Sequence, residues 1–435
     1  MNSPDIVVVG GGPIGLWTAI LTKINTDKQN TDKQILVVEK YHEYKRADIR
    51  LKISPDSFAG IPDNSQLNEL VAKWKSKKVL PIKEMEEELV KLANTLGIQI
   101  LKGKEIDPKK LQEEYPSAKV FVGADGARSI MRSEFFDDKF RFNISLQRLV
   151  QVQYITKIPF TGDESSIKKV IDAYKKLKFA GYLIEQSISP IQNDIEYSKV
   201  SLRIFIDQKT YTKMKGATFA APYYFDTHLH ELPKKIQRVL IKWWGMHNHL
   251  MPISDRDLDK DKKTNKITVI PLATYASKEF VKVRKTDEND PGTVIANVGD
   301  SAQAHPYFRA INNGLKTATK LAKCIADAFQ SEDKKPTQSI EQFASNFKSY
   351  SRYATFRAYV EGVRAIIRNI FINISKTWIE ISGGLPWETI KVSDPKKIYK
   401  KGINVWRELT DEQPPEYKSP KPLHALKNVS RRRLK

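Results

Sequence analysis

The chain has 435 residues, of which 40% are hydrophobic and 29% charged, a balance typical of a globular protein of two or three domains. A single cysteine, Cys324, excludes an intramolecular disulfide, a cysteine-based zinc site and a dithiol redox pair. No apolar run reaches the roughly 18 to 20 residues of a membrane-spanning helix, and the N-terminus lacks a signal-peptide layout, so we expect a cytoplasmic location. The formal net charge of +22 favours anionic partners, although lysines dispersed for solubility are the alternative explanation.

The N-terminal residues predict a βαβ unit. Residues 6–9 predict a buried strand, a helix is expected from Leu16, and residues 35–38 predict a second buried strand that ends at Glu39. Before that strand, residues 25–34 contain the sequence NTDKQ twice, which we interpret as a loop extension without chemistry.

The turn after the first strand has the spacing G-x-G-x-x-G. Gly10 permits a tight turn, Gly12 lets a pyrophosphate approach the backbone, and Gly15 allows the helix to pack closely on the strand. The helix N-terminus attracts negative charge, and Glu39 is placed to accept hydrogen bonds from a ribose. The motif therefore predicts a dinucleotide site, without distinguishing NAD from FAD.

Further along the chain, residues 81–96 predict an amphipathic helix and residues 98–101 another strand. The segment VFVGADGARSIMR, residues 120–132, predicts a strand that enters a compact turn followed by two arginines. Residues 140–274 contain short runs rich in Val, Ile, Tyr and Phe, which indicate a mostly β domain. A buried strand is then expected at residues 294–298, before the turn Gly299-Asp300 and a helix that begins near Asn312.

The chain beyond Pro336 is predicted to be helical, with large side chains at spacings of three and four: Tyr353, Phe356, Val360, Val363, Ile367, Ile370 and Ile374. Such a stripe normally packs on the protein's own core, and a partner or a membrane surface is the alternative. After Tyr417 the chain has seven lysines and arginines and no acid, which predicts a disordered tail or a contact with an anionic surface.

Three segments in this order, G-x-G-x-x-G, GADGARS and NVGDSAQAHPYFRAINNGLKTA, resemble the motifs of flavoprotein monooxygenases of the aromatic-hydroxylase type, which have the p-hydroxybenzoate hydroxylase fold. The stretch VVEKYHEYKRADIRLKI is also similar to the MICAL flavin domain. The motifs that carry the resemblance lie between residues 1 and about 330, and the middle domain and the C-terminal hundred residues are not covered by it. It implies an α/β fold with a Rossmann-type FAD-binding domain at 1–138 and 276–332. The residue patterns described above predict an inserted, mostly β substrate domain at 139–275, a C-terminal helical region at 333–417 and a basic tail at 418–435.

The resemblance also assigns roles to individual residues. Those expected to hold the ADP half of FAD follow the first two strands: Gly10, Gly12, Pro13, Ile14, Gly15, Glu39, Lys40 and, near the phosphates, Arg46. Those expected to support the rest of FAD and to accommodate the nicotinamide nucleotide belong to the second and third motifs: Asp125, Gly126, Arg128, Gly299 and Asp300. Pro306 would lie beside the flavin ring, and the amides of Asn312, Asn313 and Gly314 would face its N1 and O2 edge. His305 is expected to donate a hydrogen bond there, a structural role being the alternative.

The implied activity is that of an FAD-dependent monooxygenase, which uses NADPH and O₂ to oxygenate a small molecule or an acidic protein. NADPH is expected rather than NADH, because Arg128 and Arg132 would attract its additional phosphate. The alternatives are a flavin reductase or oxidase without hydroxylation, and a flavin-stabilised protein that binds an acidic partner. Residues 308–311 carry bulky side chains where the family has a glycine-rich loop, and this departure from the family pattern keeps the binding protein as an alternative. The two His-x-His pairs lack a third ligand at a recognisable spacing, so no metal site is expected.

Overall fold

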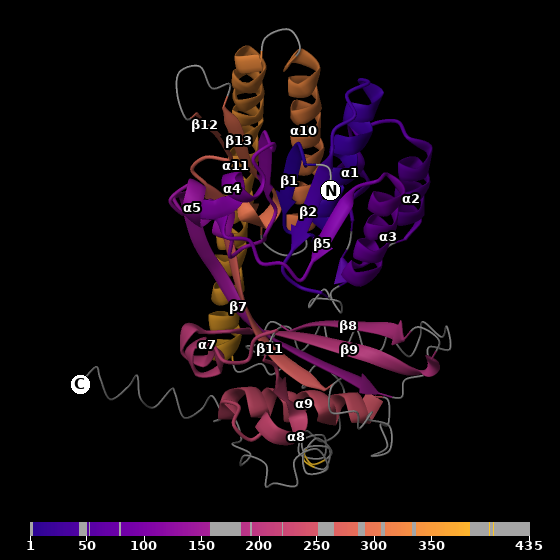
Figure 1. The fold of residues 1–435 in the computed structure, drawn as a ribbon. Coiled ribbons are helices and arrows are strands. Elements are labelled where there is room, and N and C mark those ends of the chain that lie inside the picture. Colours follow the sequence, from indigo (N-terminus) through magenta and orange to yellow (C-terminus); the bar gives the residue numbers. More distant parts are fainter. Residues whose placement is uncertain are drawn as a thin grey trace, which may run out of the picture. The chain divides into compact units, whose positions relative to one another are not determined.

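A computed structural model describes the following residues: 3–42, 50–51, 53–77, 80–156, 184–191, 194–219, 221–250, 265–285, 292–305, 309–332, 336–382, 400 and 403. The chain forms two compact units (Figure 1). Unit 1 comprises residues 1–146 and 273–366, and unit 2 comprises residues 147–272 together with the chain from residue 367. In the part of the chain that is described, no helix has the length and apolar composition needed to cross a membrane.

Unit 1 contains a six-stranded sheet in the order β12-β13-β6-β1-β2-β5 (Figure 1). Its strands are β1 (Ile6–Val9), β2 (Ile35–Glu39), β5 (Gln99–Lys102), β6 (Val120–Gly123), β12 (Val281–Arg284) and β13 (Thr293–Asn297). All neighbours are parallel except β12, which is antiparallel to β13. The chain leaves β1 toward β2 on one side, whereas β6 pairs with its other side. In parallel sheets a ligand crevice lies outside the carboxyl ends of the strands at such a reversal.

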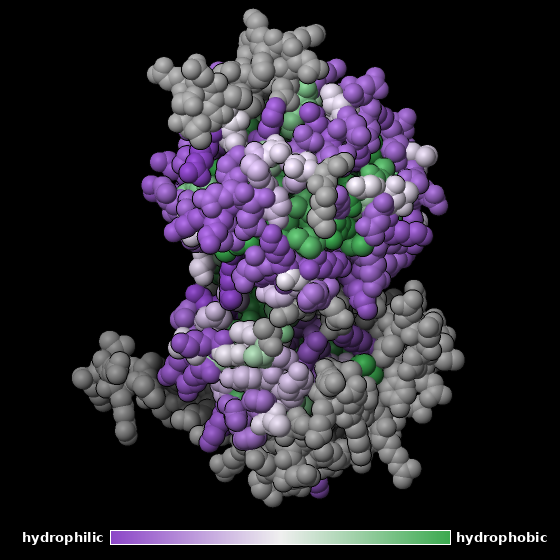
Figure 2. All heavy atoms as spheres, viewed as in Figure 1, coloured by the Kyte–Doolittle hydropathy of each residue, from purple (hydrophilic) through white to green (hydrophobic). Residues whose placement is uncertain are grey.

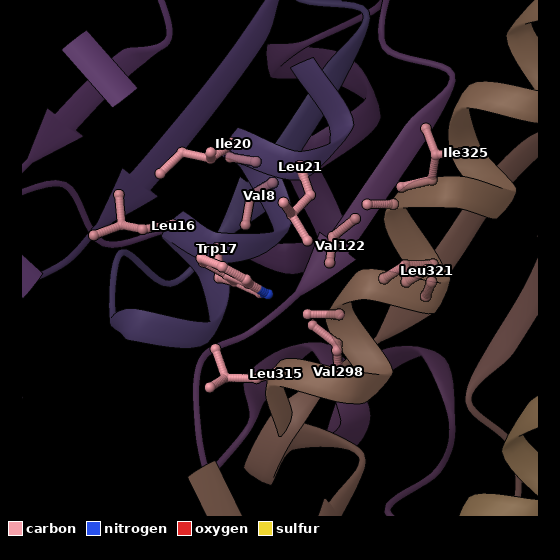
Figure 3. Packing of buried hydrophobic residues seen from close by; sticks show 14 of the residues in the cluster. Val8, Leu16, Trp17, Ile20, Leu21, Val122, Val298, Leu315, Leu321 and Ile325 are labelled. Atoms are coloured by element: carbon pink, nitrogen blue, oxygen red, sulfur yellow. The ribbon is translucent and has the colours of Figure 1, made fainter. Parts of the chain in front are cut away.

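The apolar runs of the central strands are buried on both faces of this sheet. On one face, Val8 and Val122 pack with residues of α1 (Pro13–Lys28) and α10 (Arg309–Glu332), including Trp17 and Leu321 (Figure 3). Val7, Val9, Phe121 and Ile295 belong to the separate apolar layer on the other face, with Met131 of α5 (Ile130–Phe135). Strands that lack a polar face are expected in a sheet covered by helices on both sides.

The remaining elements of unit 1 are short apart from α2 (Ser65–Ser76), α3 (Ile82–Thr95) and the first part of α11 (Pro336–Ser382). The Asn64 side chain accepts a hydrogen bond from the Leu67 amide at 3.1 Å and so caps α2. Trp17, Phe58 and Trp74 form an aromatic cluster with ring centroids 5.8 to 5.9 Å apart. The short elements are β3 (Arg50–Leu51), η1 (Pro55–Phe58), β4 (Leu80–Pro81), η2 (Pro108–Lys110), α4 (Leu111–Glu114), η3 (Gly299–Ser301) and β14 (Gln303–Ala304).

The interpretation of residues 25–34 as a loop extension is wrong for their first part. Residues 25–28 are the last turn of α1, and Thr26 is fully buried there. Lys23 pairs with Asp27 at 3.0 Å within the helix and with Asp32 at 2.5 Å beyond it. The first copy of the repeat is helical because its side chains continue the packing of α1.

Unit 2 is built on antiparallel strand pairs in the order β10-β11-β7-β9-β8 (Figure 1). The strands are β7 (Phe140–Thr156), β8 (Ile184–Ile191), β9 (Asp194–Ile206), β10 (Tyr223–Tyr224) and β11 (Lys266–Ser277). Residues 140–146 of β7 and 273–277 of β11 belong to unit 1. The helices are α7 (Gln208–Met214), α8 (Phe225–His228) and α9 (Lys234–Leu250). Trp243 of α9 donates a hydrogen bond to the fully buried hydroxyl of Tyr154 at 2.8 Å, which ties the helix to the sheet. The predicted fold class, an α/β domain with an inserted mostly β region, is confirmed.

The last described helix, α11 (Pro336–Ser382), contains the predicted stripe of large side chains. Tyr353, Phe356, Ile367 and Ile370 are exposed, so the expectation that the stripe packs on the protein's own core is wrong for these residues. Val360 and Val363 are half-buried, and the Ile374 side chain lies outside the description. The helix instead uses a face of mostly small residues, including Ala354 and Ala358, for its internal contacts.

Candidate functional site

The first two motifs meet at the carboxyl ends of β1 and β6. The Gly10 amide donates to the Val38 carbonyl, and the Ala124 amide donates to the Val9 carbonyl, both at 2.8 Å. Gly10 has a φ of 110°, and a Cβ placed on it would lie 2.5 Å from the Ala124 carbonyl oxygen. A Cβ on Gly15 would overlap the Gly10 carbonyl oxygen. Both positions therefore require glycine, for backbone conformation at Gly10 and for close approach at Gly15.

The N-terminus of α1 is open to an anion. Its N-cap is Gly12, which has no side chain to accept hydrogen bonds from the first-turn amides, and Pro13 occupies the first turn. The first turn contains no acidic residue. Glu39 lies beside this turn, where its carboxylate accepts from the Gly11 amide at 2.8 Å and from the Tyr41 amide at 2.9 Å. Because each carboxylate oxygen has two lone pairs, both oxygens can accept a further hydrogen bond.

The third motif packs against the same helix start. Gly299 has a φ of 68°, and a Cβ on it would lie 3.0 Å from the Ile14 side chain. A Cβ on Gly314 would lie 2.7 Å from Ile14. The Val298 amide donates to the Gly123 carbonyl at 2.9 Å, which joins this motif to the second one. Asp300 follows within η3, so the structure brings all three motifs together at the start of α1.

The Asp125-Gly126 turn is held by its own carboxylate. Asp125 Oδ2 accepts from the Ile130 amide at 2.7 Å and from the Met131 amide at 3.3 Å, at the start of α5. Among the described residues, Asp125 Oδ1 is buried without a hydrogen-bond partner, and burial raises the pKa of this carboxyl. Gly126 has a φ of 84°, and Arg128 is exposed.

Arg132 has a different role from the one expected for it. The residue is only 4% exposed, and its Nε pairs with Asp138 Oδ1 at 2.6 Å. Its Nη1 donates to the Ser301 carbonyl at 3.0 Å, and its Nη2 donates to the Ala127 carbonyl at 2.9 Å. The expectation that Arg132 attracts the phosphate of NADPH is therefore wrong, because its guanidinium links the second motif to the third one.

Helix α10 begins at Arg309, three residues earlier than expected. Residues 309–311 are consequently its first turn, and Ile311 packs against the core of unit 1. The Asn312 side chain accepts from the Ser54 amide at 2.8 Å and from the Ser57 hydroxyl at 2.7 Å. Asn312 therefore positions the segment around η1, a role that its spacing in the sequence did not indicate.

Some of the other predicted site residues lie outside the part of the chain that the structure describes. Arg46 and Pro306 lie outside the described residues, as does Phe308. His305 is buried at 5% exposure, Asn313 is half-buried next to Gly314, and the Lys40 ammonium lies 5.0 Å from the Tyr41 ring centroid.

Sequence reasoning missed Glu86, a carboxyl residue on the inner side of α3. It is 8% exposed, and its Oε2 has no hydrogen-bond partner among the described residues. Burial raises its pKa from 4.5 to about 7, an effect reduced by Lys102 and increased by the negative charges of Glu39 and Glu87. The available signal was its spacing from Ile82 and Leu89, four and three residues away, which places a carboxyl on the apolar side of the helix.

Glu86→Gln is expected to stabilise unit 1 at pH 8. The pKa of about 7 in the folded protein exceeds the ordinary value of 4.5, so the unfolded chain loses this proton first as the pH rises. The free energy of unfolding therefore falls by on the order of 2 kcal/mol as the pH rises from 4.5 to 7. Above pH 7 it stays at this lower value. Urea unfolding at pH 5 and pH 8 should show a smaller difference for Glu86→Gln than for the wild type. Glu105→Gln, at an exposed position of unit 1, is the control; an equal pH dependence in all three proteins would contradict the assignment.

Unit 2 contains buried polar side chains on one face of its sheet, which sequence reasoning also missed. Gln151 and Gln153 of β7 are 6% and 4% exposed, and they pair in register with Arg203 and Ser201 of β9. The Ser201 hydroxyl is buried and makes no hydrogen bond with any described residue. The signal was the alternation VQVQ, because alternate residues of a strand point to opposite faces of a sheet.

Comparisons with known proteins support the fold that the motifs predict. No protein-family model matches the chain. An 85-residue stretch is 35% identical to mitochondrial electron transfer flavoprotein-ubiquinone oxidoreductase of Dictyostelium discoideum. That stretch covers 19% of this chain and 12% of the relative, so the chain spans a small part of the relative's length.

Among solved structures, a single-residue variant of 2-methyl-3-hydroxypyridine-5-carboxylic acid oxygenase has a TM-score of 0.51 at 14% identity, over 85% of this chain and 93% of the oxygenase. CabE, an aromatic hydroxylase from angucycline biosynthesis, has a TM-score of 0.47 at 12% identity, over 93% of this chain and 76% of its own. PqsL of Pseudomonas aeruginosa, a probable FAD-dependent monooxygenase, has a TM-score of 0.44 at 12% identity, over 86% and 99%. The chain thus shares the overall fold of the 2-methyl-3-hydroxypyridine-5-carboxylic acid oxygenase variant.

The described residues fit the ADP half of FAD. The uncapped N-terminus of α1 suits a pyrophosphate, and Glu39 retains lone pairs for a ribose. The close approach of Gly10, Gly15 and Ala124 leaves the turn without side chains that would cover the helix end.

Proposed function

We propose that the protein is an FAD-dependent monooxygenase. The observation that carries this proposal is the meeting of three motifs, separated by more than a hundred residues of sequence, at the start of α1 and the carboxyl ends of β1, β6 and β13. A glycine turn that merely connects a strand to a helix requires neither the second nor the third motif. A cofactor as long as FAD contacts residues from all three.

In this proposal, the N-terminus of α1 binds the pyrophosphate, Glu39 binds the ribose, and Asp300 binds the ribityl chain. The N-terminus of α10 lies next to the third motif, where its dipole stabilises negative charge on the flavin. FAD, when bound, accepts a hydride and reacts with O₂. The protein positions the ring and excludes water from it.

NADPH is the proposed reductant, supported by the exposed Arg128 on the Asp125-Gly126 turn. An exposed guanidinium there can bind an additional phosphate dianion. The substrate is proposed to be a small molecule or an acidic protein. A flavin reductase or oxidase without hydroxylation has the same binding residues and is distinguished by its product.

The protein is expected to bind one FAD per chain without a covalent bond. The substitution Asp300→Ala is expected to weaken this binding about tenfold or more, because a charged hydrogen bond to the cofactor is lost. Flavin fluorescence measures the affinity, and the thermal shift provides a second readout. A ligand at a hundred times its dissociation constant stabilises the folded state by roughly 2.7 kcal/mol. The proposal fails if saturating FAD produces neither a bound flavin spectrum nor a thermal shift.

Turnover separates the enzymatic proposal from a flavin-stabilised binding protein. NADPH oxidation and oxygen consumption should be measured on the FAD-loaded protein with acidic proteins and aromatic compounds, for the wild type and Arg128→Ala. Labelled oxygen from O₂ in a product supports the monooxygenase, and peroxide without product supports an oxidase. If neither NADPH nor NADH reduces a flavin that reoxidises normally after photoreduction, the binding protein is the better description.

A further inference from the structure

Helix α11 has two apolar faces within unit 1. The first face is buried and contains Phe347, Ala354, Ala358 and Gly362. A Cβ placed on Gly362 would lie 2.7 Å from the Thr274 side chain, so the helix approaches β11 closely there. This face accounts for the attachment of the helix to unit 1, and it uses small residues where the backbones come together.

The second face is exposed although its side chains are large. Phe356 is 64% exposed, Tyr353 57% and Tyr359 49%, whereas Val360 and Val363 are half-buried. Their spacings of three and four place Tyr353, Phe356, Val360 and Val363 on one side of the helix. We call these four residues and Tyr359 the outer face. A face that spans residues 353–363 is about 15 Å long at the rise of an α-helix.

The charges around the outer face are almost all positive. Arg352 and Arg364 are exposed and Arg357 is half-buried, with the Arg357 guanidinium 5.9 Å from the Tyr353 ring centroid. Glu361 is the one acid between residues 342 and 366 of the sequence, and its side chain is 14% exposed and bonded to Arg364 at 3.2 Å. The surroundings of the outer face therefore favour an anionic partner.

The same charge opposes self-association through this face. Two copies of the chain would each bring a formal net charge of +22 and the same three arginines to the contact. In the view of Figure 2, hydrophilic residues surround smaller hydrophobic areas on unit 1. Among the described residues, the large hydrophobic side chains that are exposed are Tyr41, Leu101 and six residues of α11, so exposed apolar area is concentrated on this helix.

We propose that the outer face of α11 binds the surface of an anionic lipid bilayer. Aromatic and aliphatic side chains inserted at the level of the headgroups, with arginines beside the lipid phosphates, are the arrangement of helices that lie on a membrane without spanning it. Apolar burial supplies the attachment, and the arginines select anionic headgroups. The inference is independent of the proposed flavin chemistry, because none of these residues belongs to the three motifs.

The experiment is sedimentation of the full chain with phosphatidylcholine vesicles that contain or lack phosphatidylserine. The wild type should bind only the anionic vesicles, and less at high salt. Tyr353→Ser combined with Phe356→Ser should weaken binding about tenfold or more, because two large apolar groups no longer leave water. The matched pair Tyr353→Phe and Phe356→Leu, which preserves apolar area, should bind within about twofold of the wild type. Thermal unfolding verifies that all variants are folded.

Deletion of residues 418–435 distinguishes the outer face from the basic tail. The proposal expects the shortened chain to retain vesicle binding that the double serine variant loses. Wild-type affinity in the double serine variant would overturn it, as would binding that depends on the tail alone. Binding to an acidic polypeptide such as polyglutamate, without binding to anionic vesicles, would overturn it in favour of an acidic protein partner.

Discussion

Gly15→Ala is expected to abolish FAD binding and to lower the free energy of unfolding by about 3 kcal/mol. A Cβ at this position overlaps the Gly10 carbonyl oxygen and lies 3.2 Å from the Ala124 Cβ, so relief of the overlap requires α1 to move away from β1 and β6. A shift of α1 displaces its N-terminus, which is the proposed pyrophosphate site. Urea unfolding measures the stability, and flavin fluorescence measures FAD binding.

Gly216→Ala in unit 2 is the matched control for this substitution. The nearest atom to its Cβ is the Tyr223 hydroxyl at 3.1 Å, the end of a side chain that can move. This variant should unfold within about 1 kcal/mol of the wild type and bind FAD normally. If Gly15→Ala behaves in the same way, the close approach of α1 to β1 is not required for the fold or for the site.

Arg132→Met is the second substitution for which we expect a large effect, a loss of about 3 kcal/mol in the free energy of unfolding. Methionine preserves much of the side-chain volume but leaves the carbonyls of Ser301 and Ala127 without their charged donor. Because Ser301 adjoins Asp300, the variant should also bind FAD more weakly. Equilibrium unfolding in urea and a flavin titration measure the two effects separately.

Two controls isolate the internal role of Arg132. Arg128→Met makes the same change on an exposed residue of the same turn and should alter stability by less than about 0.5 kcal/mol. Asp138→Asn tests the ion pair alone, which is worth less than about 1 kcal/mol because the Asp138 side chain is 51% exposed. Equal stability of Arg132→Met and Arg128→Met would show that the link between the second and third motifs is dispensable.

The parts of the fold that could be predicted were those with local signals. A periodicity or a turn requirement within a few residues predicted three features of unit 1. These are the buried strand β1, the glycine turn after it and the apolar side of α3. The order of the three motifs then indicated the fold, because each motif combines a turn requirement with an adjacent strand or helix. The meeting of Gly10 with Ala124 follows from the pairing of two parallel strands, which the motif order implies.

Side-chain partners distant in the chain could not be predicted in this way. Arg132 and Arg128 are four residues apart in one basic segment, yet one is buried against Ser301 and the other is exposed. Asn312 was assigned through its backbone, whereas its side chain holds Ser54 and Ser57. Ser301 lies far from Arg132 in the sequence, and Ser54 and Ser57 lie far from Asn312. No periodicity or spacing of residues could therefore predict these contacts.

The stripe of α11 shows the same limit for packing. Its spacing established a helix with an apolar side, but the internal contacts were made by the small residues of the other side, around Ala358 and Gly362. Periodicity reports which residues share a side of a helix, since that depends on backbone geometry alone. Which side is covered depends on where a second element passes, and small residues permit the closest approach of two backbones. Neighbouring residues in the sequence therefore determined the backbone conformation of each element. Which side chains are buried, and which pair with one another, was decided only by the packing of segments distant in the sequence.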